Sequence, residues 1–158
     1  MNAHPDKSMT NVSFSTLSHS HEFLTFILNN INSCVLLLDK DMKLRAFNDA
    51  FKTIFSNSND EDLLYLKCGN SIGCAYHIDE QKDCGNTSQC ENCDLRLIAL
   101  DSYLNDKPIY KRQTIRPFYT KEQKKVFKCL QFSTRLFVFE GEKYVMMIID
   151  DITDISNN

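Results

Sequence analysis

Apolar residues in the first part of the chain change from no regular pattern, through helical spacing, to an unbroken run. Residues 1–18 are rich in Ser, Asn, Thr and His without periodicity, which predicts a flexible N-terminal segment. The uninterrupted apolar run over 33–38 predicts a buried strand. Between them, from His21 onwards, apolar residues recur at helical spacing and predict a short amphipathic helix with Phe23, Phe26, Ile27 and Ile31 on one side.

A second strand and a second helix are predicted directly after this run. The polar triplet 39–41 is typical of a tight turn. Residues 42–47 alternate between apolar and polar, so we expect a strand antiparallel to the first one, with Met42, Leu44 and Ala46 on a common face. Asn48 is a favourable N-cap residue for a helix over 49–55.

The second half of the chain is a long helix followed by three strands. A loop over 56–60 and a short helical turn over 61–66 precede a polar segment, and helical periodicity resumes at Asp94 and ends near 105–108. Strand patterns then occupy 109–118, 126–139 and 144–149, the last two joined by a hairpin turn at 140–143. The order predicts an α+β fold, a five-stranded antiparallel sheet with helices packed on one face.

Charge and the N-terminal sequence narrow the class of protein. A net charge of −3 gives no reason to expect a nucleic-acid or anionic membrane partner. No apolar run is long enough to span a bilayer, and the N-terminus lacks the features of a signal peptide. We therefore expect a cytoplasmic protein, and in a reducing compartment seven cysteines favour metal ligation or thiol redox chemistry over disulfides.

Cysteines are concentrated in the polar segment before the long helix. Cys74, Cys84, Cys90 and Cys93 have the spacing C-x9-C-x5-C-x2-C, and the residues between them are mostly polar. A segment without an apolar face needs another reason to be ordered, and metal–thiolate bonds supply one. These four cysteines are the predicted ligands. The two cysteines outside the region, Cys34 and Cys129, lie in strand patterns and are predicted core residues.

The spacing leaves the identity of the ligand open. Four thiolates bind both iron–sulfur clusters and structural zinc, but the chain has one Cys-x2-Cys pair where zinc sites more often have two, which favours a cluster. A metal-free switch through reversible disulfides is the third alternative. Cys68 and His77 are candidate additional ligands. Backbone amides at Gly73 and Gly85 could approach the sulfur atoms, and Lys67, Lys82 and Arg96 could offset thiolate charge.

Two stretches of the chain resemble the PAS sensor domains. One is the strand–turn–strand from Cys34 to Asn48 with Ala50-Phe51 opening the next helix, and the other is Tyr144 to Thr153, which ends in Asp-Ile-Thr. The resemblance covers roughly residues 22–154. It implies a flexible segment over 1–20 that includes the start of a lead-in helix, a PAS domain over 21–154 with a cysteine-rich insert at 68–93, and the start of an effector linker or tail over 155–158.

A narrower resemblance concerns the cysteines. Gly73-Cys74, Cys84-Gly85 and Cys90-x2-Cys93 are similar to the pattern of a bacterial PAS subset, and this similarity implies an iron–sulfur or other metal-bearing sensor. The cluster would be [4Fe-4S] or [2Fe-2S], with zinc as the alternative. We find no catalytic set and expect a non-enzymatic redox or oxygen sensor that relays its state through the long helix and the last strand.

The resemblance also implies partners. PAS domains commonly pair through the helix before the first strand, so Phe23, Phe26 and Ile27 predict a homodimer. Because the sequence ends at Asn158, we expect an excised or stand-alone module that works with an output domain such as a histidine kinase or a cyclase.

Overall fold

The computed structural model describes residues 13–55 and 63–156, and its centre is one antiparallel sheet. The order of the strands across the sheet is β2-β1-β5-β4-β3, and every neighbouring pair is antiparallel. This confirms the predicted five-stranded α+β arrangement. The strands are β1 (Cys34–Leu38), β2 (Leu44–Phe47), β3 (Ile109–Tyr119), β4 (Lys125–Phe139) and β5 (Glu142–Asp151).

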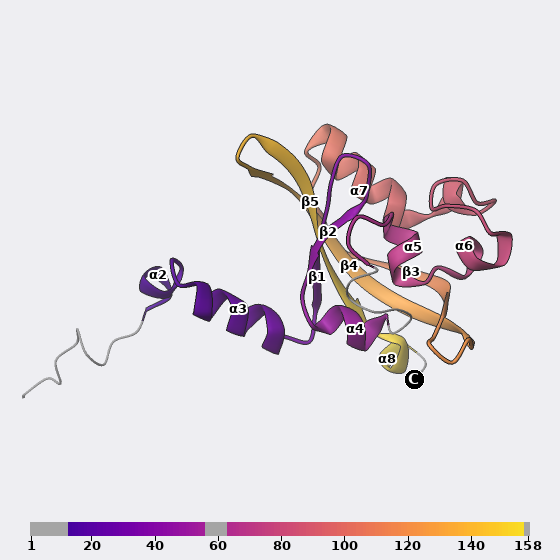
Figure 1. Cartoon of the computed structure of the whole chain (residues 1–158), viewed down its shortest axis with the longest axis horizontal. Helices are drawn as coiled ribbons and strands as arrows, with labels where there is room; N and C mark the ends of the chain where they lie inside the picture. Colours follow the sequence, from indigo (N-terminus) through magenta and orange to yellow (C-terminus); the bar gives the residue numbers. More distant parts are fainter. Residues whose placement is uncertain (1–12, 56–62, 157–158) are drawn as a thin grey trace, which may run out of the picture.

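Most of the helices gather on one side of the sheet (Figure 1). Helices α3, α4 and α7 were predicted at these positions, whereas the short helices α2 and α8 and the helices inside the cysteine segment were not. The predicted loop at 56–60 and the first residues of the helical turn at 61–66 lie outside the described residues; residues 63–66 form a turn. The helices are α2 (Phe14–Leu17), α3 (His21–Asn30), α4 (Ala50–Ile54), α5 (Cys68–Ile72), α6 (Ala75–Glu80), the 3-10 helix η2 (Cys90–Asn92), α7 (Asp94–Asn105) and α8 (Thr153–Ser156).

The core lies between the sheet and the helices on that side. Alternate residues of β1 and β5 are fully buried, as expected for central strands with one covered face. Helix α7 covers this face with Leu95 and Ala99, and α4 covers it with Phe51 and Ile54. The longest strands contribute the large side chains Phe118, Leu130 and Phe132.

Two local expectations in the first hairpin are wrong. Leu38 pairs with Leu44 and Leu37 with Ala46, so Arg45 is an extra residue that forms a bulge. Because a bulge reverses the alternation of faces, Leu44 points into the core and Ala46 lies exposed on the other face.

Asn48 does not cap α4, whose N-cap residue is Asp49. The side chain of Asn48 instead accepts a hydrogen bond from the Val35 amide at 2.9 Å and donates to the carbonyls of Leu28 at 2.6 Å and Ser33 at 3.0 Å. Asn48 is buried, so its amide serves as a junction between α3 and β1.

Helix α3 stands apart from the sheet and projects from it together with α2 (Figure 1). None of its residues is buried within the chain, and Phe26 is 65% exposed. The predicted pairing of two copies through this helix stays a prediction. In the described residues no helix has the length and apolar character needed to cross a membrane.

Candidate functional site

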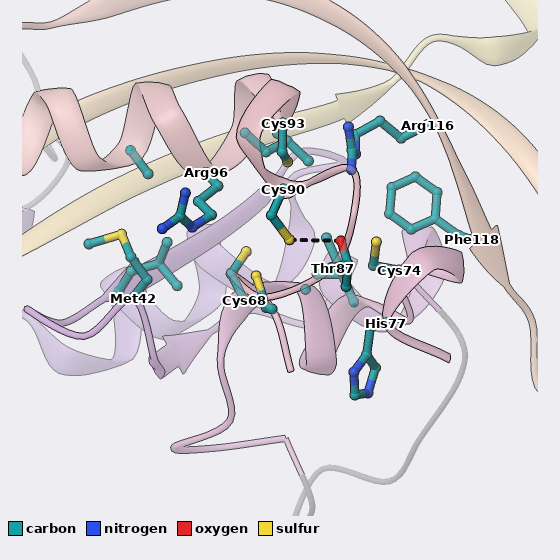
Figure 2. A pocket seen from close by; sticks show the side chains of 16 residues that line it. Met42, Cys68, Cys74, His77, Thr87, Cys90, Cys93, Arg96, Arg116 and Phe118 are labelled. Atoms are coloured by element: carbon teal, nitrogen blue, oxygen red, sulfur yellow. Dashed lines mark hydrogen bonds between the residues drawn. The ribbon is translucent and has the colours of Figure 1, made fainter. Parts of the chain in front are cut away.

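All five cysteines of the cysteine-rich segment line one small cavity with a volume of about 30 Å³. Figure 2 shows the sulfur atoms of Cys68, Cys74, Cys90 and Cys93 gathered around a shared space. Cys84 lines the same cavity. The cavity has room for roughly one or two water molecules. The four predicted ligands are therefore brought together, and Cys68 joins them.

Short helices place these cysteines. Cys68 is the first residue of α5, which ends at Gly73 in the left-handed conformation with φ 77°. The chain then reverses, so that Cys74 stands at the N-cap of α6. Cys93 occupies the N-cap of α7, as expected from the sequence. The prediction that Gly73 donates to a sulfur atom is wrong. Gly73 is the C-cap of α5, its amide donates to the Gly69 carbonyl, and its left-handed conformation permits the reversal of the chain.

Cys84 is held by close packing against α5. A Cβ atom added to Gly69 would lie 2.9 Å from the Cys84 sulfur and 3.0 Å from its Cβ atom. The Cys84 amide donates to Oδ1 of Asn70 at 2.9 Å. Glycine is needed at position 69 because the loop that carries Cys84 lies directly on the helix.

Cys90 has a different environment from the other buried thiols. The Gly85 amide donates to its sulfur at 3.1 Å, which confirms the expected approach of this backbone group. The Thr87 hydroxyl lies 2.9 Å from the same sulfur atom (Figure 2). Burial opposes ionisation of Cys90, but these hydrogen bonds and the charge of Arg96 outweigh burial and lower its pKa.

Burial has the opposite result at three other thiols. It raises the pKa of Cys84 to about 11 and also raises the pKa of Cys93. At Cys68 burial, reinforced by the neighbouring cysteines, raises the pKa well above its ordinary value. These thiols therefore stay protonated at neutral pH unless a cation compensates for the charge of their thiolates.

Two cationic side chains and no acidic ones line the cavity among the described residues. Arg96 was predicted from the sequence, whereas Lys67 and Lys82 are not among the described residues that line it. Arg116 comes from β3, is only 8% exposed and was not predicted. Thr87 was also missed; the one signal for it was a hydroxyl residue between two predicted ligands.

His77 lines the edge of the cavity, but its ring points away from the sulfur atoms (Figure 2). Its Nδ1 atom lies 2.7 Å from the carbonyl oxygen of Lys82, which makes Nδ1 the protonated nitrogen. Cys34 and Cys129 are buried in strands β1 and β4 and do not line the cavity formed by the described residues, in agreement with their predicted core role.

The cysteine segment is fastened to the end of β3. Cys74 forms a bridge with Phe118, and the Tyr119 amide donates to the Gly73 carbonyl at 2.9 Å. On α6, Asp79 accepts hydrogen bonds from Tyr119 and from Lys125, each at 2.6 Å. The cavity therefore lies between the cysteine segment, the start of α7 and the inner face of β3.

The donor set fits a thiophilic centre, but not in the geometry of a single ion. Sulfur ligands select zinc, copper(I) and iron–sulfur clusters. Among the described residues, no group of three or more His, Cys, Asp or Glu side chains is arranged to hold one metal ion. All seven cysteines are free thiols. What the chain supplies is a convergent set of free thiols around one small cavity.

Known structures with the same architecture are PAS domains. No family model and no curated protein matches the sequence. A PAS domain from a two-component sensor histidine kinase has a TM-score of 0.55 at 11% identity, covering 87% of this chain and 98% of its own.

Two bacterial structures give similar values. The PAS domain of nitrogen regulation protein NR(II) from Vibrio parahaemolyticus has a TM-score of 0.58 at 15% identity, covering 82% of this chain and 97% of its own. The PAS domain of Bordetella pertussis BvgS has 0.52 at 14% identity, covering 86% of this chain and 88% of its own. This chain therefore has the PAS fold.

Proposed function

We propose that this protein is a non-enzymatic sensory PAS module that binds an iron–sulfur cluster through Cys74, Cys84, Cys90 and Cys93. The observation that carries the proposal is the convergence of these thiols, from separate local elements, on one cavity. Cys68 lines the same cavity and is a spare or replacement ligand. When bound, such a cluster supplies a centre whose charge or integrity changes with redox state or oxygen.

The cysteine spacing favours a cluster over a single zinc ion, because the chain has one Cys-x2-Cys pair where zinc sites more often have two. Four sulfur ligands of one zinc ion must lie about 2.3 Å from a common point. The described thiols do not form such a group. Ligands of a cluster bind different iron atoms and can stand farther apart, so convergence without a common point is compatible with a polynuclear centre.

A specific observation favours one rival function, a metal-free thiol switch. The pKa of Cys90 is lowered, so this thiol has more thiolate character than its neighbours. Cys90 would then attack a peroxide, which leaves as water or an alcohol, and a second thiol in the cavity would displace water from the resulting sulfenic acid to form a disulfide. Such a switch needs no ligand geometry at all.

The proposed output is a signalling domain such as a histidine kinase or a cyclase, and the proposed assembly is a homodimer through α3. One structural neighbour is the PAS domain of a two-component sensor histidine kinase. The exposed helix α3 is consistent with pairing, because none of its residues is buried within the chain. We also propose that the module works in the reducing cytoplasm, where its thiols remain available.

Anaerobic purification of the chain tests the proposal. We expect a coloured protein with iron and inorganic sulfide in stoichiometric amounts. Cys90→Ser and Cys93→Ser should lose most of the iron, whereas Cys129→Ser, which changes a buried cysteine of β4 outside the cavity, should keep it. A colourless protein with bound zinc would favour a structural zinc site. A folded, metal-free protein would refute ligation and leave the thiol switch.

A further inference from the structure

Arg116 is a buried cation that has no acidic partner among the residues the structure describes. It lies on β3, is 8% exposed, and lines the cavity together with the five cysteines. Its guanidinium group stands 5.2 Å from the centre of the Tyr76 ring. Among the described residues, the four ion pairs with carboxylates all involve other cations, and Arg116 makes none.

A buried guanidinium without an anion is unfavourable, because it loses hydration and gains little in exchange. One aromatic face offsets part of this cost. The cavity that Arg116 lines has no carboxylate in its described wall and a second arginine, Arg96, at the start of α7. Two positive charges from different elements therefore face a set of thiols.

Figure 2 shows the guanidinium end of Arg116 directed toward Cys93. Arginine has no lone pair to give a metal and stays protonated in proteins, so Arg116 cannot be a ligand. Its five N–H groups and its charge instead suit an anion next to it.

We propose that Arg116 is the counter-charge of the centre, which is anionic when formed, and that Arg116 tunes the potential of this centre without ligating it. The inference rests on the proposed function. Four thiolates around a [4Fe-4S] core of charge +2 give a net charge of −2, and reduction adds one more electron to the centre. A fixed positive charge beside the thiolates therefore stabilises the loaded form and favours its reduction.

The inference predicts effects of opposite sign in the empty and loaded protein. In the empty protein, Arg116→Met replaces a buried unpaired charge by an apolar side chain of comparable length, so the melting temperature should be unchanged or higher. In the loaded protein the same change removes the counter-charge, so the cluster should be lost more readily. A purely structural role for Arg116 would lower stability in both forms.

The experiment compares three variants after anaerobic reconstitution with iron and sulfide. Arg112→Met is the matched control, because Arg112 lies on the same strand but is exposed and outside the cavity. Arg116→Lys keeps the charge and lacks the planar fork. The readouts are the midpoint potential of the bound cluster, the rate of iron loss to a chelator, and the melting temperature of the metal-free protein.

We expect Arg116→Met to lower the midpoint potential and to accelerate iron loss roughly 10- to 100-fold, the usual range for losing an outer partner of a metal site. Arg116→Lys should lie much closer to the wild type, and Arg112→Met should match it. Should Arg116→Met fail to fold, Arg116→Lys decides the question. If Arg116→Lys loses iron as fast as Cys90→Ser or Cys93→Ser, the role of charge is overturned.

Two failures can be told apart. If the wild type takes up no iron under these conditions, the proposed function falls, and the inference falls with it. If the wild type loads normally but Arg116→Met has the potential and iron-loss rate of Arg112→Met, only the inference is overturned. Lower stability of metal-free Arg116→Met would likewise assign Arg116 a structural role.

Discussion

Gly69 offers the sharpest test of how the cysteine segment is packed. In a helix, replacing Gly by Ala ordinarily stabilises a protein by about 1 kcal/mol, because alanine has the higher helix propensity. Gly69 lies within α5, so propensity alone predicts a more stable Gly69→Ala variant. The new Cβ atom would, however, lie 2.9 Å from the Cys84 sulfur and 3.0 Å from the Cys84 Cβ atom.

The magnitude follows from the balance of these two effects. Overpacking of a well-packed site costs typically about 1–3 kcal/mol. After subtraction of the propensity gain, Gly69→Ala should lower the free energy of unfolding by up to about 2 kcal/mol. The Cys84 loop should also move away from α5, which separates Cys84 from the other thiols and weakens metal uptake.

Urea unfolding of the metal-free, reduced protein measures this balance. The sulfur makes the shorter of the two contacts, so the cost of Gly69→Ala should shrink in a Cys84→Ala background. We expect a coupling free energy of about 1 kcal/mol from the double-mutant cycle. A Gly69→Ala variant that is about 1 kcal/mol more stable than the wild type, with no coupling to Cys84, would refute the close packing.

Three further predictions concern single side chains. Thr87→Val removes the hydroxyl beside the Cys90 sulfur, so it should raise the pKa of Cys90, measured as a shift of its thiolate titration to higher pH. The hydrogen bond from Lys125 lowers the pKa of Asp79, so its contribution to stability is present above the unfolded-state pKa of about 3.9 and is lost as the pH falls through the lower folded value. The difference in melting temperature from Asp79→Asn should therefore be present at neutral pH and vanish in acid. Asn48→Ala leaves three backbone groups without their partner and should cost about 2–4 kcal/mol in denaturant unfolding.

The fold could be predicted because its strands carry strong local signals. The long strands carry clear strand patterns, and the order of elements leaves few ways to build the sheet. The face of Ala46 was predicted wrongly because one extra residue, Arg45, reverses the alternation of inward and outward side chains along β2. Nothing in the run from 42 to 47 marks Arg45 as a bulge, and the hydrogen bonds of Asn48 reach partners up to twenty positions away.

The candidate site was only partly predictable for a related reason. The spacing of the cysteines predicts them as ligands, and the position of Gly85 next to Cys84 predicts the approach of its amide to a sulfur atom. The sequence predicts only a polar segment where α5 and α6 stand, because the apolar residues of these short helices are too few to show a period. Arg116 had no local signal, since it is brought to the thiols by the packing of the cysteine segment against β3, seen in the bridge between Cys74 and Phe118.

The position of Arg116 also indicates how the site could reach the end of the domain. In the sheet, Arg116 pairs with Lys128 of β4, and Lys128 donates to Asp151 at 3.0 Å. The neighbouring Cys129 carbonyl accepts from the Ile152 amide at 2.9 Å, so β4 holds the segment that follows β5.

Along this route a change at β3 crosses one strand, β4, to reach the exit segment. Hydrogen exchange of the Ile152 and Thr153 amides, compared between loaded and metal-free protein, tests it. We expect slower exchange in the loaded form and a smaller difference in Lys128→Met, which lacks the contact to Asp151. Equal exchange in both forms would contradict a route through β3 and β4, because a coupled segment must respond to the state of the site.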